Sequence, residues 1–412
     1  MKEIYLIKKT KKLLDSHEKW MSQTINLIAS ENLLSPLAKN CLISDLGNRV
    51  AEGWIGERIF PGIKYYDEIE QIGIDIVKQM FCCDFVDLRP ISGTHANMIV
   101  YTAFTNPNDK VLSFSIKNGG HISMSGGTPK NMFKLQVLGI PVSNDGFTID
   151  VPRTLEVIMQ EKPKLVIMGG SVLLFRQEIK EIVKLCKSLD ILTIFDASHV
   201  AGLIATGDYE NPMKDGIDIM TFSTCKTIPG PQHAIIVANG KYGEIIKKTT
   251  FPSTVSGHHL HETVSAIVTL LELKLFGRNY IHNVVLNSKA LARELSNLDM
   301  NILFKDKDFT ETHMLLMKNK SKYETKELEK RFEKANIIFN RNILPGDVGF
   351  KNPSGFRIGT PEITRIGMTE VDMPVIAQFI SDVYYGKKSI EKVKNEVVSF
   401  RKDFQTVKYC YE

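Results

Sequence analysis

The sequence predicts an α/β protein in which a mostly parallel sheet is covered by helices. Short apolar runs at 164–170, 191–196, 217–223 and 234–239 have the length and composition of buried strands, and the stretch 178–189 has the spacing of an amphipathic helix. Strand, helix and strand in this order indicate parallel strands joined by helical crossovers. Because ligands in such sheets bind at the carboxyl ends of the strands, the residues that follow each run are the first candidates for a site.

The chain on either side of this alternating region has a different pattern. Residues 1–20 are basic and alternate charged with apolar residues, which predicts an amphipathic helix packed on the body of the protein or on a second subunit, and not a signal peptide. A long helix is predicted near 255–290. After it, apolar runs at 314–318 and 355–360 flank a charged helix at 325–337, which predicts a smaller α+β domain.

Three domains follow from this division. We expect an N-terminal helical arm with a dimer contact at residues 1–50, a large domain at 51–280 and a small C-terminal domain at 281–412. No linker rich in proline, glycine or serine marks the second boundary, so we place it within the long helix.

The composition excludes several classes of protein. Of the 412 residues, 43% are hydrophobic and 24% charged, which excludes a disordered chain, a collagen-like repeat and a coiled-coil rod. The net charge of +5 is too weak on this length to predict nucleic-acid binding. No apolar run reaches about 18 residues, so we expect no membrane span. The six cysteines lack the paired spacing of metal sites and are too scattered for a disulfide scaffold, which predicts no metal and a cytoplasmic protein.

A phosphate cradle is predicted at 91–98. Ser92, Gly93 and Thr94 open a helix there, and the first turn of a helix offers unpaired backbone N–H groups at the positive end of its dipole. Hydroxyl side chains would add further donors to a phosphate or a carboxylate. Taken alone, the segment also fits an ordinary capped helix.

Two ionisable residues follow two of the predicted strands. Asp196 ends the run 191–196, where an acid is costly unless it has a cationic partner, so it could cap a helix or pair with a protonated ring nitrogen. Lys226 follows the run 217–223 among hydroxyl residues and a Pro-Gly-Pro turn, and partial burial there would lower its pKa and suit Schiff-base chemistry. The 30 residues between them match one crossover, so adjacent strand ends could bring both to one ligand.

A phosphate cradle, an acid and a lysine are the three contacts that pyridoxal phosphate needs. The lysine would form a Schiff base with the cofactor aldehyde. The acid would keep the pyridine nitrogen protonated, so that the ring can accept electrons from a carbanion at Cα. His121, which lies between glycines at 119–127, could stack on the ring or be a loop histidine without a ligand.

The chain also resembles the serine hydroxymethyltransferase family of fold-type I pyridoxal-phosphate enzymes. The similar segments cover roughly residues 15–395 and occur in the family's order. They are LIASEN (27–32), AEG (51–53), PGIKYYDEIE (61–70), ISGTHAN (91–97), GGHIS (119–123), DASHVAGLIA (196–205), STCKTIPGP (223–231) and SGFRIGTPEITRIGM (354–368). The resemblance implies a mostly parallel sheet of the seven-stranded type, with the cofactor bound in the large domain.

The resemblance implies nine cofactor-binding residues. They are Ser92, Gly93, Thr94, His121, Asp196, His199, Ser223, Lys226 and Gly257. Lys226 would carry the Schiff base, Asp196 would pair with the ring nitrogen and His199 would approach the ring hydroxyl. His121 would stack on the ring, and Gly257 would add a backbone contact from the neighbouring subunit.

The resemblance also implies an amino-acid substrate bound by residues of two subunits. Arg357 would hold the α-carboxylate in a bidentate fork, helped by Ser30. Glu52 would be the acid–base carboxylate for the substrate hydroxyl, and Tyr66 would lie beside the substrate. Both would come from the neighbouring subunit, so the active unit would be a homodimer or a higher oligomer. Asn342 would lie near a pterin if one binds.

Several positions depart from the family pattern. The departures are Val50 in place of a tyrosine, Asp67 and Glu68 in place of a glycine pair, Met124 and Cys225 each in place of a histidine, Gln232 in place of an arginine, and a longer segment at 53–62. A lost hydrogen bond to a charged phosphate would weaken cofactor binding by about 1.5–3 kcal/mol. We expect weaker binding unless Arg58, Lys64 or a histidine at 258, 259 or 261 compensates.

Three functions are consistent with these residues. The first is transfer of a one-carbon unit from serine to tetrahydrofolate, which leaves glycine. The second is a folate-independent threonine-type aldolase or transaldolase, which would add a glycyl carbanion to another aldehyde. The third is a non-catalytic binding or regulatory protein, which the presence of Lys226, Asp196, His199, Glu52 and Arg357 together disfavours.

Overall fold

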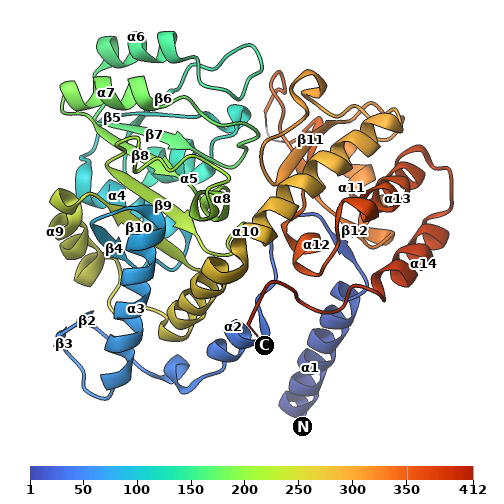
Figure 1. The fold of residues 1–412 in the computed structure, drawn as a ribbon, viewed down its shortest axis with the longest axis horizontal. Coiled ribbons are helices and arrows are strands. Elements are labelled where there is room, and N and C mark those ends of the chain that lie inside the picture. The colour runs from blue at the N-terminus through green and yellow to red at the C-terminus, as the bar shows by residue number, and fades with distance from the viewer. Residues whose placement is uncertain (350, 412) are drawn as a thin grey trace. The chain divides into compact units, whose positions relative to one another are not determined.

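The computed structural model describes residues 1–349 and 351–411, which form two compact units (Figure 1). The large unit comprises Asn32–His282 and Tyr409–Glu412, and the small unit comprises Met1–Glu31 and Asn283–Lys408. The N-terminal segment therefore clusters with the C-terminal part of the chain. Each unit has its own sheet and its own core.

The large unit is built on a seven-stranded sheet with the strand order β4-β10-β9-β8-β7-β5-β6. The strands are β4 (Phe85–Asp87), β5 (Lys110–Ser113), β6 (Gln136–Gly139), β7 (Leu165–Gly169), β8 (Leu192–Asp196), β9 (Ile219–Ser223) and β10 (Ala234–Ala238). Neighbouring strands from β6 to β9 are parallel, whereas β10 is antiparallel to both β9 and β4. The predicted mostly parallel sheet is confirmed, although the last of the predicted strands runs in the opposite direction.

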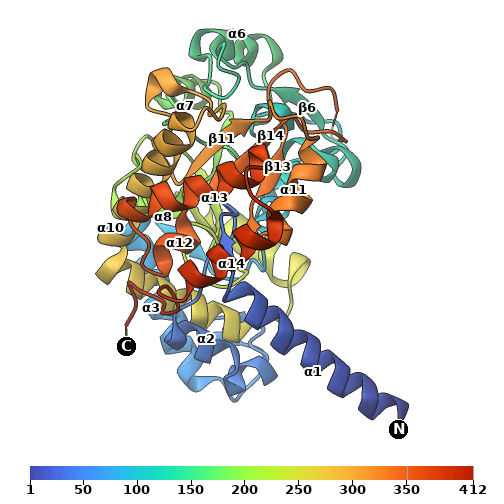
Figure 2. The same ribbon diagram turned by 90° about the vertical axis from the view of Figure 1, so that its right-hand side faces the viewer.

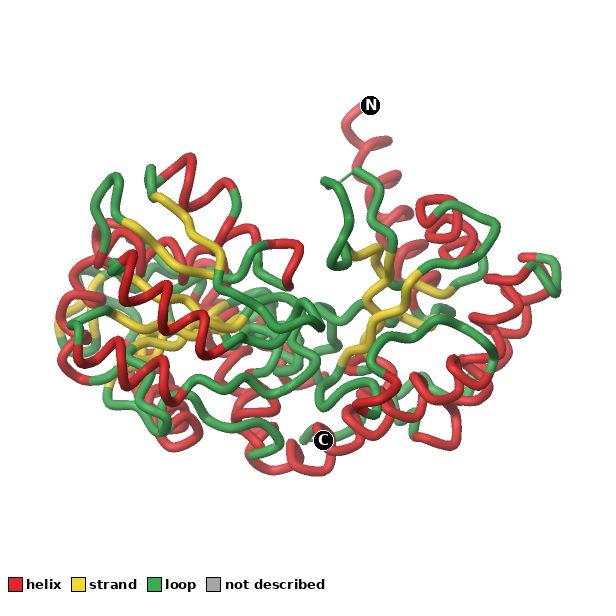
Figure 3. The backbone as a smooth tube through the Cα atoms, turned by 90° about the horizontal axis from the view of Figure 1, so that it is seen from above, coloured by secondary structure: helices red, strands yellow, loops and turns green. Residues whose placement is uncertain are grey.

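Helices of the large unit surround this sheet on both faces, and others pack at its periphery. The helices are α2 (Pro36–Leu42), α3 (Lys64–Phe81), α4 (Gly93–Phe104), α5 (Ile122–Ser125), α6 (Val151–Glu161), α7 (Lys180–Ser188), α8 (Ala201–Thr206) and α9 (Gly240–Lys248), with α10 (Leu260–Asn297) continuing into the small unit. Figure 3 shows the strands of this unit, in yellow, with helices on both sides of them. Helix α4 packs against β9 and β10, and α7 packs against β8.

The apolar residues of the strands form the core between the sheet and these helices. All five residues of each of β7, β8, β9 and β10 are buried, as expected for strands covered on both faces. Side chains such as Ile167, Ile194 and Ile236 pack in one cluster with Ile99 of α4. On other strands and helices, Phe222 and Phe81 pack with their ring centroids 4.6 Å apart. Burial on both sides fixes these strands and therefore fixes the residues that follow them.

The small unit is an α+β fold. Its three-stranded antiparallel sheet has the order β11-β14-β13, formed by β11 (Met314–Lys318), β13 (Asn340–Asn342) and β14 (Gly355–Gly359), and β1 (Ile25–Asn26) pairs in parallel with β12 (Ile337–Ile338). The helices are α1 (Lys2–Met21), α11 (Thr325–Lys334), α12 (Pro361–Arg365), α13 (Met373–Tyr385) and α14 (Ile390–Arg401), of which α11, α13 and α14 pack together (Figure 2). The predicted strands at 314–318 and 355–360 are confirmed. The helix predicted at 325–337 is confirmed up to Lys334, but its predicted end was wrong, because Ile337 belongs to β12.

Short elements complete the two units. They are the hairpin strands β2 (Gly53–Trp54) and β3 (Glu57–Arg58), the 3-10 helices η1 (Asp45–Asn48), η2 (Ile116–Asn118), η5 (Lys305–Lys307) and η6 (Glu370–Asp372), and the π-helices η3 (Thr128–Met132) and η4 (Thr249–Thr254).

Helix α1 forms where the basic N-terminal pattern predicts a helix. None of its residues is buried, and apolar side chains such as Ile4, Ile7 and Leu13 are exposed. Its last turn is attached to the small unit, because Trp20 Nε1 donates a hydrogen bond to Asn336 Oδ1 at 3.0 Å. Among the residues that the structure describes, no helix is long and apolar enough to cross a membrane, and no group of three or more histidine, cysteine or acidic residues could hold a metal ion.

A buried carboxyl group makes the stability of the small unit depend on pH. Glu362 of α12 is 7% exposed, and Asn26 Nδ2 donates to its Oε2 at 2.7 Å. Burial is the main cause that raises the pKa of Glu362 from 4.5 to about 7. Between these two pH values the folded protein holds a proton that the unfolded chain releases, so stability falls as the pH rises through this window.

We therefore predict that Glu362→Gln flattens the pH dependence of stability. The wild type should lose on the order of 3 kcal/mol of unfolding free energy between about pH 5 and about pH 8 through this group, and the variant should not. Denaturant unfolding at both pH values measures the difference. Glu370→Gln, at an exposed position of the same unit, is the control and should behave as the wild type. An unchanged pH slope in Glu362→Gln would show that the carboxyl is already ionised in the folded state.

Candidate active site

A cavity of about 180 Å³ lies at the carboxyl edge of the large unit's sheet. The register pairs Gly169 with Asp196 and Asp196 with Thr221, so the ends of β7, β8 and β9 lie side by side. The residues that line the cavity are Ser92, Gly93, Thr94, His121, Gly170, Ser171, Asp196, Ser198, His199, Ser223, Cys225, Lys226 and Gln232. Residues from distant parts of the sequence therefore meet at the edge where ligands bind in parallel sheets.

The first turn of α4 forms one wall of the cavity. Ser92 is the N-cap, and its Oγ accepts a hydrogen bond from the amide of His95 at 3.2 Å. The amides of Gly93 and Thr94 belong to the turn whose N–H groups have no acceptor within a helix. A Cβ on Gly93 would lie 3.3 Å from Ser198 Oγ, so a side chain here would narrow the wall. This wall has the donors and the dipole that bind a phosphate.

The hydroxyl of Ser223 indicates that a polar ligand fits beside this wall. Ser223 is 5% exposed, and its Oγ has no hydrogen-bond partner among the residues that the structure describes. A buried hydroxyl without a partner costs about 1–3 kcal/mol. A ligand with acceptor oxygens in the cavity would remove that cost, which is what a phosphate group offers.

Asp196 is oriented by donors to both of its carboxylate oxygens. The residue is 4% exposed; the amide of Ser198 donates to Oδ1 at 3.0 Å, and Asn97 Nδ2 donates to Oδ2 at 3.0 Å. Asn97 is itself fixed, because its Oδ1 accepts from Thr221 Oγ1 at 2.8 Å and its Nδ2 also reaches Ser123 Oγ at 2.9 Å. The acid therefore presents a fixed carboxylate to the cavity.

The approach of β7 to this acid requires a glycine. Gly169 has a φ of +83°, and a Cβ there would lie 2.2 Å from the backbone oxygen of Asp196. The next amide, of Gly170, donates to the same oxygen at 3.2 Å. After β7 the chain therefore passes close to the backbone of Asp196, and the next two residues, Gly170 and Ser171, line the cavity.

Lys226 and two histidines complete the cavity. Lys226 follows β9, is partly buried, and has a backbone oxygen that accepts from Asn32 Nδ2 at 2.5 Å. His121 is the N-cap of α5, and its Nδ1 lies 2.7 Å from Ser123 Oγ. His199 is 2% exposed. The lysine, the acid and a ring that can stack are therefore brought to one cavity.

The structure brings together eight of the nine predicted cofactor-binding residues. Those in the lining are Ser92, Gly93, Thr94, His121, Asp196, His199, Ser223 and Lys226. Gly257 is exposed and lies outside the lining, as does Glu52, which is partly buried in the segment before β2. The resemblance placed both on the neighbouring subunit's site, and that placement stays a prediction.

Tyr66 is buried against a histidine of its own subunit. The residue is 1% exposed, and its hydroxyl lies 2.7 Å from His258 Nε2. Burial raises the pKa of Tyr66 and lowers the pKa of His258, so both groups are neutral at pH 7. The role of Tyr66 beside a substrate in a neighbouring subunit stays a prediction.

The predicted carboxylate-binding residues lie in the small unit. Arg357 is the central residue of β14, paired with Leu316 and Asn340, and is 8% exposed. Burial lowers the pKa of Arg357 to about 10, so the guanidinium is still charged at pH 7. The segment before Ser30 runs along the end of β14, where the amide of Gly359 donates to Leu27 O at 2.7 Å. Ser30 and Arg357 therefore belong to the same part of this unit.

Two departures from the family pattern meet in the cavity. Cys225 and Gln232 both line it, and Cys225 Sγ donates to Gln232 Oε1 at 3.3 Å. Arg58, one of the residues that could compensate for the missing arginine, has a 7% exposed side chain that pairs with Asp67 and Glu70. Arg58 lies outside the cavity lining, so within this subunit it adds no positive charge beside Cys225 and Gln232.

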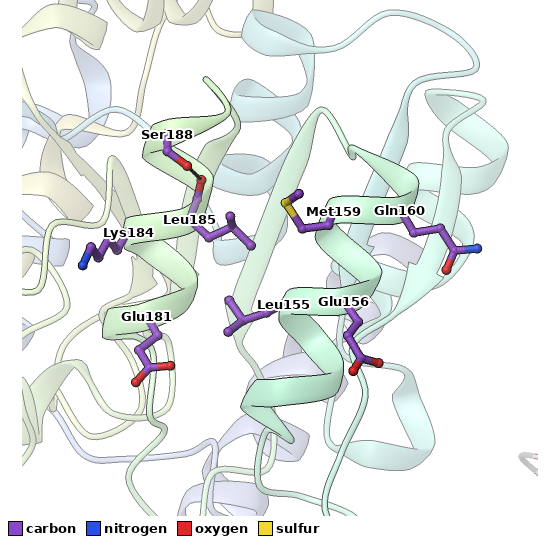
Figure 4. Close-up of a pocket in the computed structure, with 8 residues that line it drawn as sticks. All are labelled: Leu155, Glu156, Met159, Gln160, Glu181, Lys184, Leu185 and Ser188. Carbon is purple, nitrogen blue, oxygen red and sulfur yellow. Dashed lines mark hydrogen bonds between the residues drawn. The ribbon is translucent and has the colours of Figure 1, made fainter.

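A larger pocket of about 960 Å³ lies between α6 and α7 of the large unit (Figure 4). Its lining is Leu155, Glu156, Met159, Gln160, Glu181, Lys184, Leu185 and Ser188. Figure 4 shows Leu155, Met159 and Leu185 pointing toward one another across the gap between the helices. All of these residues come from two helices and none from a strand end, so the smaller cavity is the candidate active site.

The fold and the cavity together define a class of enzyme. A mostly parallel seven-stranded sheet, with a phosphate cradle at a helix start and an acid and a lysine at neighbouring strand ends, is the arrangement of a fold-type I pyridoxal-phosphate enzyme. The donors of α4, the hydroxyl of Ser223 and the fixed carboxylate of Asp196 fit that cofactor.

Comparison with known proteins identifies the family. The family model described as serine hydroxymethyltransferase matches residues 7–380. A serine hydroxymethyltransferase of Korarchaeum cryptofilum is 42% identical over 96% of this chain and 95% of its own length. Those of Archaeoglobus fulgidus and Nitrosopumilus maritimus are each 40% identical over 97% of this chain and over 92% and 94% of their own lengths. The chain therefore belongs to the serine hydroxymethyltransferase family, and the predicted pyridoxal-phosphate-dependent enzyme is confirmed.

The residues around Asp196 include one that the sequence analysis missed. Asn97 was quoted within a family-like segment but was given no role. Its spacing of one helical turn from Gly93 is the signal that could have found it, because residues four apart share a face of a helix. In the structure that face is turned to Asp196.

We predict that Asn97→Ala weakens the binding of pyridoxal phosphate about 10- to 100-fold. The substitution removes a hydrogen bond to a charged carboxylate, which is worth about 1.5–3 kcal/mol, and frees Asp196 to turn. Equilibrium titration of the apoprotein by cofactor absorbance measures the dissociation constant. Thr102→Ala, on the exposed face of the same helix, is the control and should bind as the wild type. Equal affinity in Asn97→Ala would show that Asn97 does not orient the acid.

Proposed function

We propose that this protein cleaves and forms the Cα–Cβ bond of a β-hydroxy amino acid, converting serine to glycine with transfer of the one-carbon unit to tetrahydrofolate. The observation that carries the proposal is the cavity that gathers the first turn of α4, Asp196 and Lys226. The relatives that match nearly the whole chain bear the name serine hydroxymethyltransferase. When bound, pyridoxal phosphate supplies an electron sink for the electron pair left on Cα.

Within this proposal the large unit holds the cofactor. Lys226 is the point of covalent attachment, Asp196 holds a proton on the pyridine nitrogen, and His199 approaches the ring hydroxyl. The phosphate binds the amides and hydroxyls of Ser92, Gly93, Thr94 and Ser223, while His121 stacks on the ring. Support comes from the donors on Asp196 and from the buried hydroxyl of Ser223.

The substrate is bound through its charged groups. Arg357, helped by Ser30, holds the α-carboxylate, for which a buried guanidinium is well suited because it stays charged and offers a planar pair of donors. Glu52 exchanges a proton with the substrate hydroxyl, which is the step that allows the Cα–Cβ bond to break. Tyr66 lies beside the substrate, and Asn342 lies near the pterin.

We further propose a homodimer or higher oligomer with shared sites, in which Glu52, Tyr66 and Gly257 act in the neighbouring subunit. The arm at 1–50 forms the dimer contact, 51–280 is the cofactor-binding domain and 281–412 the small domain. Large apolar side chains are exposed near Glu52, which supports an interface there; they are Ile43, Val50, Ile59 and Phe60. The cysteines form no disulfide within the described residues, which supports a reducing, cytoplasmic location.

A folate-independent aldolase or transaldolase is the second candidate. Cys225 and Gln232 occupy the cavity where the family has a histidine and an arginine. An uncharged pair in these positions changes the shape and the charge of the pocket, which favours an aldehyde other than formaldehyde. The two candidates differ in whether folate is the acceptor.

Product analysis separates these functions. Purified protein loaded with pyridoxal phosphate is supplied with serine or threonine, with and without tetrahydrofolate. We expect glycine from serine, formed at least about tenfold faster with the folate. Aldehyde release from threonine that does not respond to folate would instead support the second candidate.

We predict that Lys226→Ala abolishes the visible absorbance of the Schiff base between protein and cofactor and lowers turnover by several orders of magnitude. The reason is that no other lysine lines the cavity within the described residues. Absorbance spectra and serine turnover measure the two effects. Lys248→Ala, an exposed lysine, is the control. Retention of the Schiff-base absorbance in Lys226→Ala would refute the assignment of the attachment point.

A further inference from the structure

The segment that carries Glu52 is held by a buried arginine. Strands β2 and β3 form a hairpin in which Gly53 pairs with Arg58, and the amide of Ile59 donates to the backbone oxygen of Glu52 at 3.0 Å. Gly53 has a φ of +89°, and a Cβ there would lie 2.3 Å from Glu57 O, so the hairpin requires a glycine directly after Glu52.

The guanidinium of Arg58 donates hydrogen bonds to backbone carbonyls on both sides of Glu52. Its Nη1 donates to Ala51 O at 3.1 Å and to Gly53 O at 2.5 Å. These are the carbonyls of the residues immediately before and after Glu52. The Ala51 carbonyl belongs to the peptide unit that precedes Glu52, and the Gly53 carbonyl belongs to the unit that follows Gly53. One planar group therefore holds the chain on both sides of Glu52, and the hydrogen bond from the Ile59 amide to the Glu52 carbonyl holds the peptide unit between them.

Two carboxylates of α3 fix the guanidinium in turn. Arg58 Nε donates to Asp67 Oδ1 at 2.9 Å, and Nη2 donates to Glu70. The side chains of Arg58 and Glu70 are 7% and 1% exposed. Because charge-assisted hydrogen bonds in a buried setting are strong and directional, helix α3 acts as the support for the arginine.

A second arginine reinforces the arrangement. Arg89 Nη2 lies 2.7 Å from Glu70 Oε1 and donates to Gly53 O at 3.3 Å. Its guanidinium carbon lies 3.5 Å from the centroid of the Trp54 ring. The hairpin is thus attached to the body of the large unit through Glu70, which lies between the two arginines.

The carboxylate of Glu52 depends on this backbone for its position. Within the part of the chain that the structure describes, no hydrogen bond or ion pair of the Glu52 side chain is present, and the side chain is partly buried. A group that transfers a proton must be held near its partner, and a displacement of about 1 Å can cost a factor of about 100 in rate.

We propose that Arg58, held by Asp67 and Glu70, is a positioning residue that fixes the backbone around Glu52 and thereby aims its carboxylate. The proposal rests on the acid–base role that we proposed for Glu52.

The test compares Arg58→Lys with Arg49→Lys. A lysine keeps the charge but cannot bind two carbonyls and two carboxylates in one plane. Arg49 is the matched control, because it also pairs with an aspartate, Asp45, at 2.6 Å. Unlike Arg58, it is exposed and donates to no backbone carbonyl within the described chain. We expect Arg58→Lys to lower kcat for serine about 10- to 100-fold with KM and the Schiff-base absorbance nearly unchanged.

A second readout does not depend on activity. Hydrogen exchange of the holoenzyme over residues 51–60 should be about tenfold faster in Arg58→Lys and unchanged in Arg49→Lys, because the amide of Ile59 would lose its fixed acceptor. Asp67→Asn, which keeps the arginine but removes one of its anchors, should show the same changes to a smaller degree. This variant also keeps the test informative if Arg58→Lys folds poorly.

The outcomes separate the positioning role from the role of Glu52. A kcat in Glu52→Gln equal to that of the wild type would overturn the acid–base role, and the positioning proposal with it. A strong loss in Glu52→Gln, combined with unchanged kcat in Arg58→Lys and Asp67→Asn, would overturn the positioning proposal alone. A parallel rise in KM and loss of cofactor absorbance in Arg58→Lys would likewise overturn it, since that pattern indicates a general structural effect.

Discussion

One buried carboxylate organises the candidate active site. Asp196 ends a strand whose residues are all buried, and an acid in that position is costly unless donors and a positive charge surround it. Asn97 and the amide of Ser198 each donate a hydrogen bond to one of its oxygens. A cation in the cavity would stabilise this carboxylate further, and a protonated pyridine ring would be such a cation. Lys226 and the first turn of α4 line that same cavity.

Some of the departures expected from the family pattern lie in contacting pairs. Cys225 contacts Gln232 at the cavity wall, and Asp67 contacts Arg58 beneath the segment that carries Glu52. Residues in direct contact have coupled energies, so each pair is best understood as one change. The first pair is uncharged and lines the cavity, whereas the second is an ion pair beside the segment that carries Glu52.

Local pattern was sufficient for most of the large unit's architecture. The predicted runs became β7, β8, β9 and β10 within a residue or two of their predicted limits, because a strand buried on both faces must be apolar throughout. The direction of β10 was not predictable, since hydrophobicity is the same in both directions along a strand. The edge strands β4 and β6 and the inner strand β5 were also missed, because each is only three or four residues long.

The sequence by itself determined the family, the mostly parallel character of the sheet and eight of the residues that line the cavity. These depend on short segments, each of which can be interpreted by itself. Only the tertiary structure decided that Asn97 orients Asp196 and that Tyr66 is buried against His258. It also decided that Arg58 donates to the carbonyls on both sides of Glu52. These contacts join residues up to 192 positions apart. A hydrogen bond depends on distance and angle in space, and no spacing along the chain encodes them.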